Sequence, residues 1–128
     1  MKKFLTVVFA ILLTASTAHA EIFACAGEAE YCTPKNNAEF AAYWAQILAE
    51  QNLVKKICVH LRANTTLVDD VKISDDDLAT QCMMILEITD TKVELANEAD
   101  SVRAKVFVTG QIDLDELKSR LDGFRKNS

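Results

Sequence analysis

The chain contains no CxxC pair, no excess of basic residues, and no second long apolar run after its first twenty residues. Without CxxC, neither a thioredoxin-like redox centre nor a zinc knuckle is indicated. Asp and Glu number 19 against 14 Lys and Arg, which argues against binding to nucleic acid or anionic lipid, because both require basic patches. A spanning helix needs about 20 apolar residues, so we expect no membrane span.

Histidine, proline and glycine are also scarce, at two, one and three residues. His60 is the only histidine after residue 20, and no serine has the context of an activated nucleophile. The acidic run 75–77 lacks the spacing and central glycine of a calcium loop, and fits the first turn of a helix instead. We therefore expect a non-enzymatic protein with no cofactor and no metal site.

Residues 1–20 have the pattern of a secretory signal peptide. Lys2 and Lys3 precede an apolar run over 4–13, and the segment ends in Ala18-His19-Ala20. We expect cleavage after Ala20 and a periplasmic or secreted product. Lipidation of Cys25 is the alternative, although a charged residue separates this cysteine from the apolar run. Cleavage would leave twelve Lys and Arg against nineteen Asp and Glu, a net charge of about −7.

Four cysteines follow the cleavage point, and an even number in a small exported chain predicts two disulfides. We expect Cys25 and Cys32 to close a small ring within an N-terminal arm, residues 21–35. Cys58 and Cys82 would then join a strand to the following helix. That bridge closes a loop of about 25 residues and contributes roughly 3.5 kcal/mol in the loop-entropy model. A zinc site formed by Cys58, His60 and Cys82 together with Cys25 or Cys32 is the alternative.

The segment from Asn36 to Leu61 has the longest helical pattern and holds the only Trp. Asn36 is placed to cap the helix. The end of the helix is ambiguous. It either stops near Lys55, with a strand over 57–68, or continues to about Ala63, and β-branched residues favour the strand. The expected buried face has helical spacing and consists of Phe40, Tyr43, Trp44, Ile47, Leu48 and Val54.

The remaining helices are predicted from helix-capping residues, and the remaining strands from alternating apolar and polar residues. Ser74 caps a helix that ends near Glu87, and Asp113 caps a last one. Residues 89–96 and 102–109 form an antiparallel hairpin. The predicted order is α-β-α-β-β-α: a single α+β domain over 36–128, with a three-stranded, mainly antiparallel sheet under the long helix.

Three stretches carry a resemblance to a known domain: AAYWAQILAEQ (41–51), VHLRANTTLVDDVKISDD (59–76) and SVRAKVFVTG (101–110). Together they resemble the small α/β domain shared by a bacterial outer-membrane lipoprotein antigen family and the N-terminal region of the flagellar H-ring assembly protein T. The resemblance implies an envelope-located structural or interaction domain without a known catalytic centre.

Phe40, Tyr43, Trp44 and His60 are the candidate binding surface. At helical spacing these aromatic residues are also typical of a core, so both interpretations stay open. The leading hypothesis is an exported envelope protein that serves as a structural or protein-interaction module, with another envelope or secreted protein as its partner. The alternative is a small secreted effector or an inhibitor of a periplasmic enzyme. An unpaired sheet edge could recruit a partner by strand addition.

Overall fold

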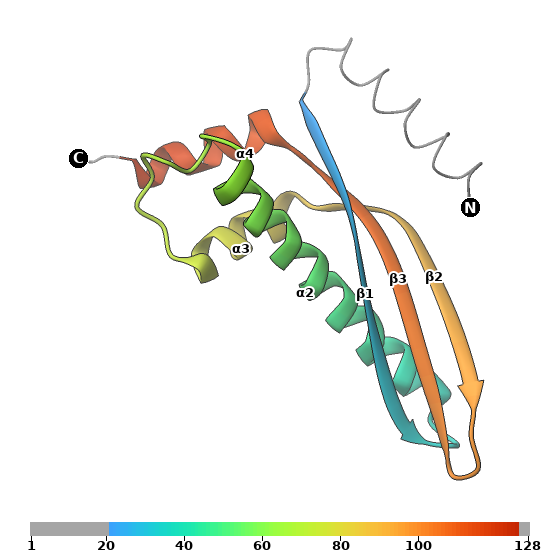
Figure 1. Ribbon diagram of the computed structural model, residues 1–128. Helices are drawn as coiled ribbons and strands as arrows, with labels where there is room; N and C mark the ends of the chain where they lie inside the picture. Colours follow the sequence, from blue (N-terminus) through green and yellow to red (C-terminus); the bar gives the residue numbers. More distant parts are fainter. Residues whose placement is uncertain (1–20, 126–128) are drawn as a thin grey trace.

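The computed structural model describes residues 21–125 and has an α+β architecture: helices on one side of a three-stranded antiparallel sheet (Figure 1). A long helix, α2, runs along the sheet, while two short helices gather near one of its ends. The elements, in chain order, are β1 (Ile22–Pro34), α2 (Ala38–Asn64), α3 (Asp75–Ile85), β2 (Glu87–Asn97), β3 (Ser101–Asp113), α4 (Leu114–Leu121) and a 3₁₀ turn (Asp122–Phe124). Among these residues, no helix is long and apolar enough to cross a membrane.

The last strand, β3, lies at the centre of the sheet, between β1 and β2. Every second residue of β3 is buried, from Val102 to Ile112, because these side chains face α2 while their neighbours face outward. Residues paired across an antiparallel sheet share a face, so the register with β3 assigns each side chain of β1 and β2 to the helix side or the outer side.

Small residues allow α2 to lie close against β1 and β3. The buried row of α2 recurs every four residues and begins with alanines. Opposite this row, the backbone of Gly27 packs so tightly that a Cβ there would lie 2.6 Å from both the Ala49 carbonyl oxygen and the Leu53 nitrogen. The row consists of Ala41, Ala45, Ala49, Leu53, Ile57 and Leu61. We call the contact between this row and Gly27 of β1 the alanine seam.

The predicted N-terminal arm with a disulfide ring is wrong, because residues 22–34 form β1 and belong to the sheet. Cys25 and Cys32 are both free. They are seven residues apart on one strand, roughly 23 Å at 3.3 Å per residue. Cys25 lies on the helix side and Cys32 on the outer side, as the register with β3 requires. The observed order is therefore β-α-α-β-β-α, and the domain begins in the arm.

The predicted strand over 57–68 is also wrong, since α2 continues to Asn64. Ile57 and Leu61 extend its buried row, so burial outweighs the strand preference of β-branched residues. Asn36 does not cap the helix; Asn37 holds that position without a side-chain cap bond.

The C-terminal half agrees with the predictions. The Asp77 N–H donates to the Ser74 hydroxyl oxygen at 3.1 Å, and Asp113 accepts from two N–H groups at the start of α4. The hairpin forms as expected, with strands longer than predicted. Ser74 and Asp113 thus fix both helix starts from local sequence alone.

Candidate binding surface

Four aromatic residues form a cluster at the N-terminal end of α2, and we call this cluster the aromatic patch. Trp44 is its centre, with ring centroids 6.4 Å from Tyr31, 6.2 Å from Phe40 and 5.7 Å from Tyr43. Tyr31 comes from β1 and also packs edge-on against Phe40. The patch therefore spans the helix and the neighbouring edge strand.

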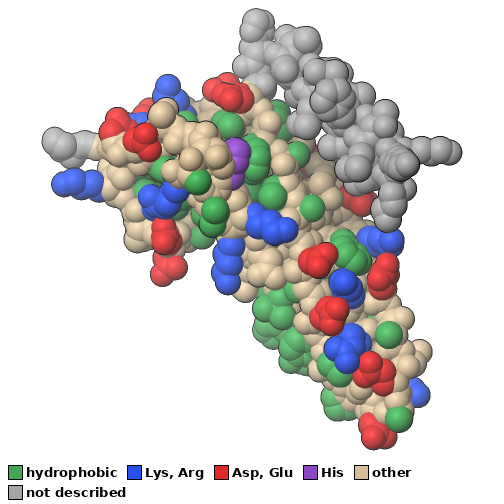
Figure 2. All heavy atoms as spheres, in the orientation of Figure 1, with side chains coloured by type: hydrophobic (Ala, Val, Ile, Leu, Met, Phe, Trp, Pro, Cys, Tyr) green, Lys and Arg blue, Asp and Glu red, His purple; other side chains and the backbone are tan. Residues whose placement is uncertain are grey.

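The predicted burial of this face is wrong. Phe40, Tyr43 and Trp44 are 49%, 61% and 37% exposed, whereas Ala41 and Ala45 are fully buried. Of the six residues expected on the buried face, only Val54 is buried. The close approach across the alanine seam leaves no room for large rings under the helix, so they project from its flank. Figure 2 shows hydrophobic side chains gathered along the lower part of α2.

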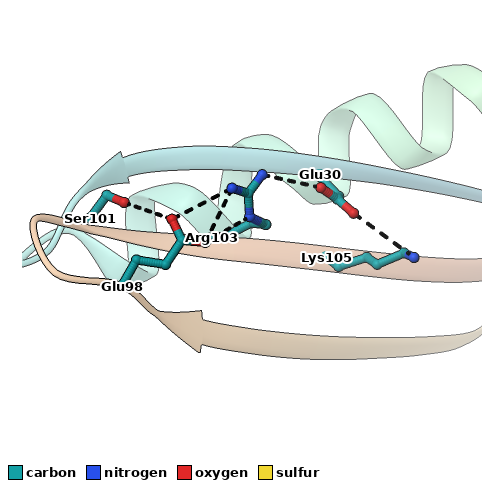
Figure 3. A network of polar contacts seen from close by, with 5 residues as sticks. All are labelled: Glu30, Glu98, Ser101, Arg103 and Lys105. Atoms are coloured by element: carbon teal, nitrogen blue, oxygen red, sulfur yellow. Dashed lines mark hydrogen bonds and ion pairs between the residues drawn. The ribbon is translucent and has the colours of Figure 1, made fainter.

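The outer face of the sheet carries charges instead. Arg103 donates hydrogen bonds to the carboxylates of Glu98 and Glu30, and Lys105 pairs with the second oxygen of Glu30 (Figure 3). The Arg103 hydrogen bonds hold the pKa of Glu98 below its usual range, helped by the Ser101 hydroxyl. These exposed pairs order the face without making a catalytic site.

His60 lies apart from the aromatic patch. It is sixteen residues beyond Trp44 on the same helix, roughly 24 Å at 1.5 Å per residue. Its ring stacks on Phe23 with centroids 4.0 Å apart and planes 7° apart, and its Nδ1 lies 3.3 Å from the Asn64 side-chain nitrogen. The structure thus gives His60 packing partners and separates it from the other three candidate residues.

Cys58 of α2 and Cys82 of α3 approach to 4.3 Å, without a disulfide. A hydrogen bond from the Cys82 thiol lowers the pKa of Cys58, while the same bond and burial raise the pKa of Cys82. A hollow of about 440 Å³ beside them is lined by Cys58 and Arg62, among others. In residues 21–125, no group of three or more His, Cys, Asp or Glu side chains is arranged to hold a metal ion.

Sequence reasoning missed two features of the surface. Tyr31 joins the aromatic patch, which required knowledge that the arm is a strand. The exposed apolar residues Val93 and Leu95 lie on edge strand β2, and the hairpin prediction did not say which strand would be at an edge. Comparison with known protein families finds none that matches this chain, and no curated protein matches it.

Proposed function

We propose that this chain is an exported, non-enzymatic protein of the bacterial envelope, and that its aromatic patch binds a protein partner. The observation that carries the proposal is the patch itself: three large rings of α2 are exposed beside a helix face built of alanine. Exposed aromatic clusters are enriched at binding sites, because burying such rings on contact yields much of the binding free energy.

The partner's chemistry follows from the patch and the net charge. Packed rings favour a concave apolar pocket on the partner. The chain after residue 20 has a charge of about −7, so a basic rim around that pocket would speed association. Export rests on the signal-peptide pattern of residues 1–20, which lie outside the described part of the structure, and envelope location also rests on the resemblance described above.

An oxidising compartment would also join Cys58 to Cys82. The two thiols lose two protons and two electrons to a disulfide oxidant of that compartment, so one sulfur–sulfur bond forms between Cys58 and Cys82 while the oxidant's own disulfide is reduced to a dithiol. Their 4.3 Å approach requires only a small closure between α2 and α3. The bridge would stabilise the fold by roughly 3.5 kcal/mol, and Cys25 and Cys32 would stay reduced.

The binding proposal is tested by a photo-crosslinking amino acid placed at Tyr43 in cells that express the full chain. Val59 is the matched control, since it is an apolar residue of the same helix and is also exposed. We expect a specific crosslinked protein from position 43 and none from position 59. Trp44→Ala should abolish that crosslink while leaving the circular dichroism spectrum unchanged.

Equal crosslinking from both positions, or a product that survives Trp44→Ala, would refute a role for the patch. A captured hydrolase whose activity the purified protein lowers would favour the inhibitor hypothesis. Peptide mass mapping of the exported protein tests the compartment, with Glu21 expected at the N-terminus and a single Cys58–Cys82 bridge. An intact Met1 with four reduced cysteines would contradict export.

A further inference from the structure

The two edges of the sheet differ. On β1, side chains of α2 cover outward carbonyl oxygens: Asn52 donates to Glu28 at 2.9 Å and Lys56 donates to Ala26 at 3.1 Å. On β2, the described residues show no side chain that covers the outer edge in this way. Natural proteins commonly blunt free edges, because an open edge is a template for pairing with another strand.

Edge strand β2 also has an uncovered apolar stripe on the helix side of the sheet. Val93 and Leu95 pair with Val106 and Ala104 of β3, which are fully buried, yet Val93 and Leu95 are themselves 45% and 53% exposed. Val93 and Leu95 are exposed because α2 lies over β1 and β3, away from β2 (Figure 1). The helix therefore leaves open space beside the edge.

Charges on the outer face of the sheet identify the occupant of that edge. One row across the sheet reads Glu30 on β1, Lys105 on β3 and Glu94 on β2. The signs alternate, and Glu30 and Lys105 form an ion pair. Glu94 pairs with Lys92 of its own strand at 3.4 Å, and a cation opposite Glu94 on an added strand would continue the alternation of charge across the sheet. The chain's own β2 has such a cation two residues away, at Lys92, which lies over the Phe107 ring on the same face.

We propose that two copies of this chain associate through antiparallel pairing of β2 with β2, with the two-fold axis at Val93, to form a continuous six-stranded sheet. Lys92 of each copy then lies directly opposite Glu94 of the other. Val93 faces its own symmetry mate on the helix side, and Thr91 faces Leu95. Cross-strand pairs of opposite charge stabilise a sheet, and like charges directly opposite each other destabilise it.

Neighbouring symmetric registers are excluded by the same residues. An axis at Glu94 places two glutamates face to face, and an axis at Lys92 places two lysines face to face and Glu94 opposite Asp90. The axis at Val93 pairs residues 89–97 with their counterparts, and this span ends where the bulge at 88–90 interrupts the register. Charge therefore disfavours both neighbouring registers, and the axis at Val93 uses the full length of β2 that follows the bulge.

The test is analytical ultracentrifugation of the purified protein from about 10 µM to 1 mM, a range that detects weak association. A Cys32→Ser background removes the exposed thiol of the outer face, which could otherwise crosslink copies. We expect a reversible dimer. Lys92→Glu and Glu94→Lys should each weaken it by about tenfold or more, because each change creates two like-charge pairs. Val93→Lys, with two cations at the axis, should also dissociate it.

The charge swap makes the inference specific. The double variant Lys92→Glu/Glu94→Lys restores opposite charges at both positions and should dimerise like the wild type. The two single variants, when mixed, should form a heterodimer more tightly than either variant associates with itself. Lys118→Glu changes the same charge on exposed α4 and should have no effect. Circular dichroism checks that each variant folds.

A wild-type protein that stays monomeric to 1 mM would overturn the proposal, as would a dimer insensitive to Lys92→Glu and Val93→Lys. Failure of the mixed single variants to associate would overturn the register. Dimerisation and partner binding use different surfaces, so failure of one proposal can be distinguished from failure of the other. Trp44→Ala should leave the dimer intact, and Lys92→Glu should leave crosslinking from Tyr43 intact.

Discussion

Replacing Gly27 by alanine tests whether the alanine seam determines how helix and sheet pack. The new Cβ would lie 2.6 Å from the Ala49 carbonyl oxygen and from the Leu53 nitrogen, and 2.8 Å from the Leu53 Cβ. Ordinary van der Waals contact begins near 3.4 Å, so the strand must retreat by most of an ångström. Two of the three opposing atoms belong to the α2 backbone, which cannot yield by rotating a side chain.

Overpacking of a well-packed core lowers stability by about 1–3 kcal/mol. Because two of the obstructing atoms belong to the backbone, we expect a cost near the upper end of that range. Reduced freedom of the unfolded chain offsets about 0.4–1 kcal/mol of this cost. We expect Gly27→Ala to lower the free energy of unfolding by about 2 kcal/mol, the difference between these terms. For a domain of this size, that loss corresponds to a Tm lower by roughly 8 °C.

The assay is urea unfolding followed by fluorescence of Trp44, the only tryptophan. Gly123→Ala is the matched control, because a Cβ at that position would meet nothing within 4 Å. It should leave stability unchanged or raise it by less than about 1 kcal/mol. If both variants unfold at the same urea concentration as the wild type, the close contact between β1 and α2 does not limit packing and the reasoning fails.

Three further predictions concern single interactions. Asp113→Ala removes the cap of α4 and should cost about 1 kcal/mol in the same urea assay. Arg103→Met should raise the lowered pKa of Glu98, which a carboxyl NMR titration measures. The pKa of Glu98 is lower in the folded protein than in the unfolded chain. The pair of Arg103 and Glu98 therefore contributes to folding stability above the ordinary Glu pKa, and this contribution is lost as pH falls through the lowered pKa. In the reduced protein, Cys82→Ala removes the hydrogen bond that lowers the pKa of Cys58, so alkylation of Cys58 should require higher pH.

The elements predicted correctly are those whose signals are local. Ser74 and Asp113 mark helix starts because a side-chain oxygen satisfies N–H groups of the first turn, and the hairpin follows from alternation across a polar turn. None of these signals depends on the partner element. The pairing of β1 with β3 and the order of the three strands do depend on it, and no local signal indicates them.

The errors came from residues whose role depends on a distant partner. The middle of the helix side of β1 consists of small residues, Gly27 and Ala29, which have weak strand preference. The two cysteines of β1 give the stronger pattern, which predicts a disulfide ring in place of a strand. The large apolar and aromatic residues of the helix, from Phe40 to Val54, predict the wrong buried face for α2, because only Val54 among them is buried. The residues of α2 that face the sheet are the alanine row. Such a row indicates close packing against a strand only when the glycine opposite it, Gly27, is recognised as part of that strand.

The pairing of β1 with β3 has a consequence for the timing of folding. Ile22, the first residue of β1, is matched with Asp113, 91 positions later in the sequence. Contacts of such large separation form slowly because a long loop must close first. The central strand is also the last to be synthesised, so a growing chain lacks the template its first strand requires. If the chain is exported as proposed, β1 would have no partner strand until β3 had followed it through the translocation pore.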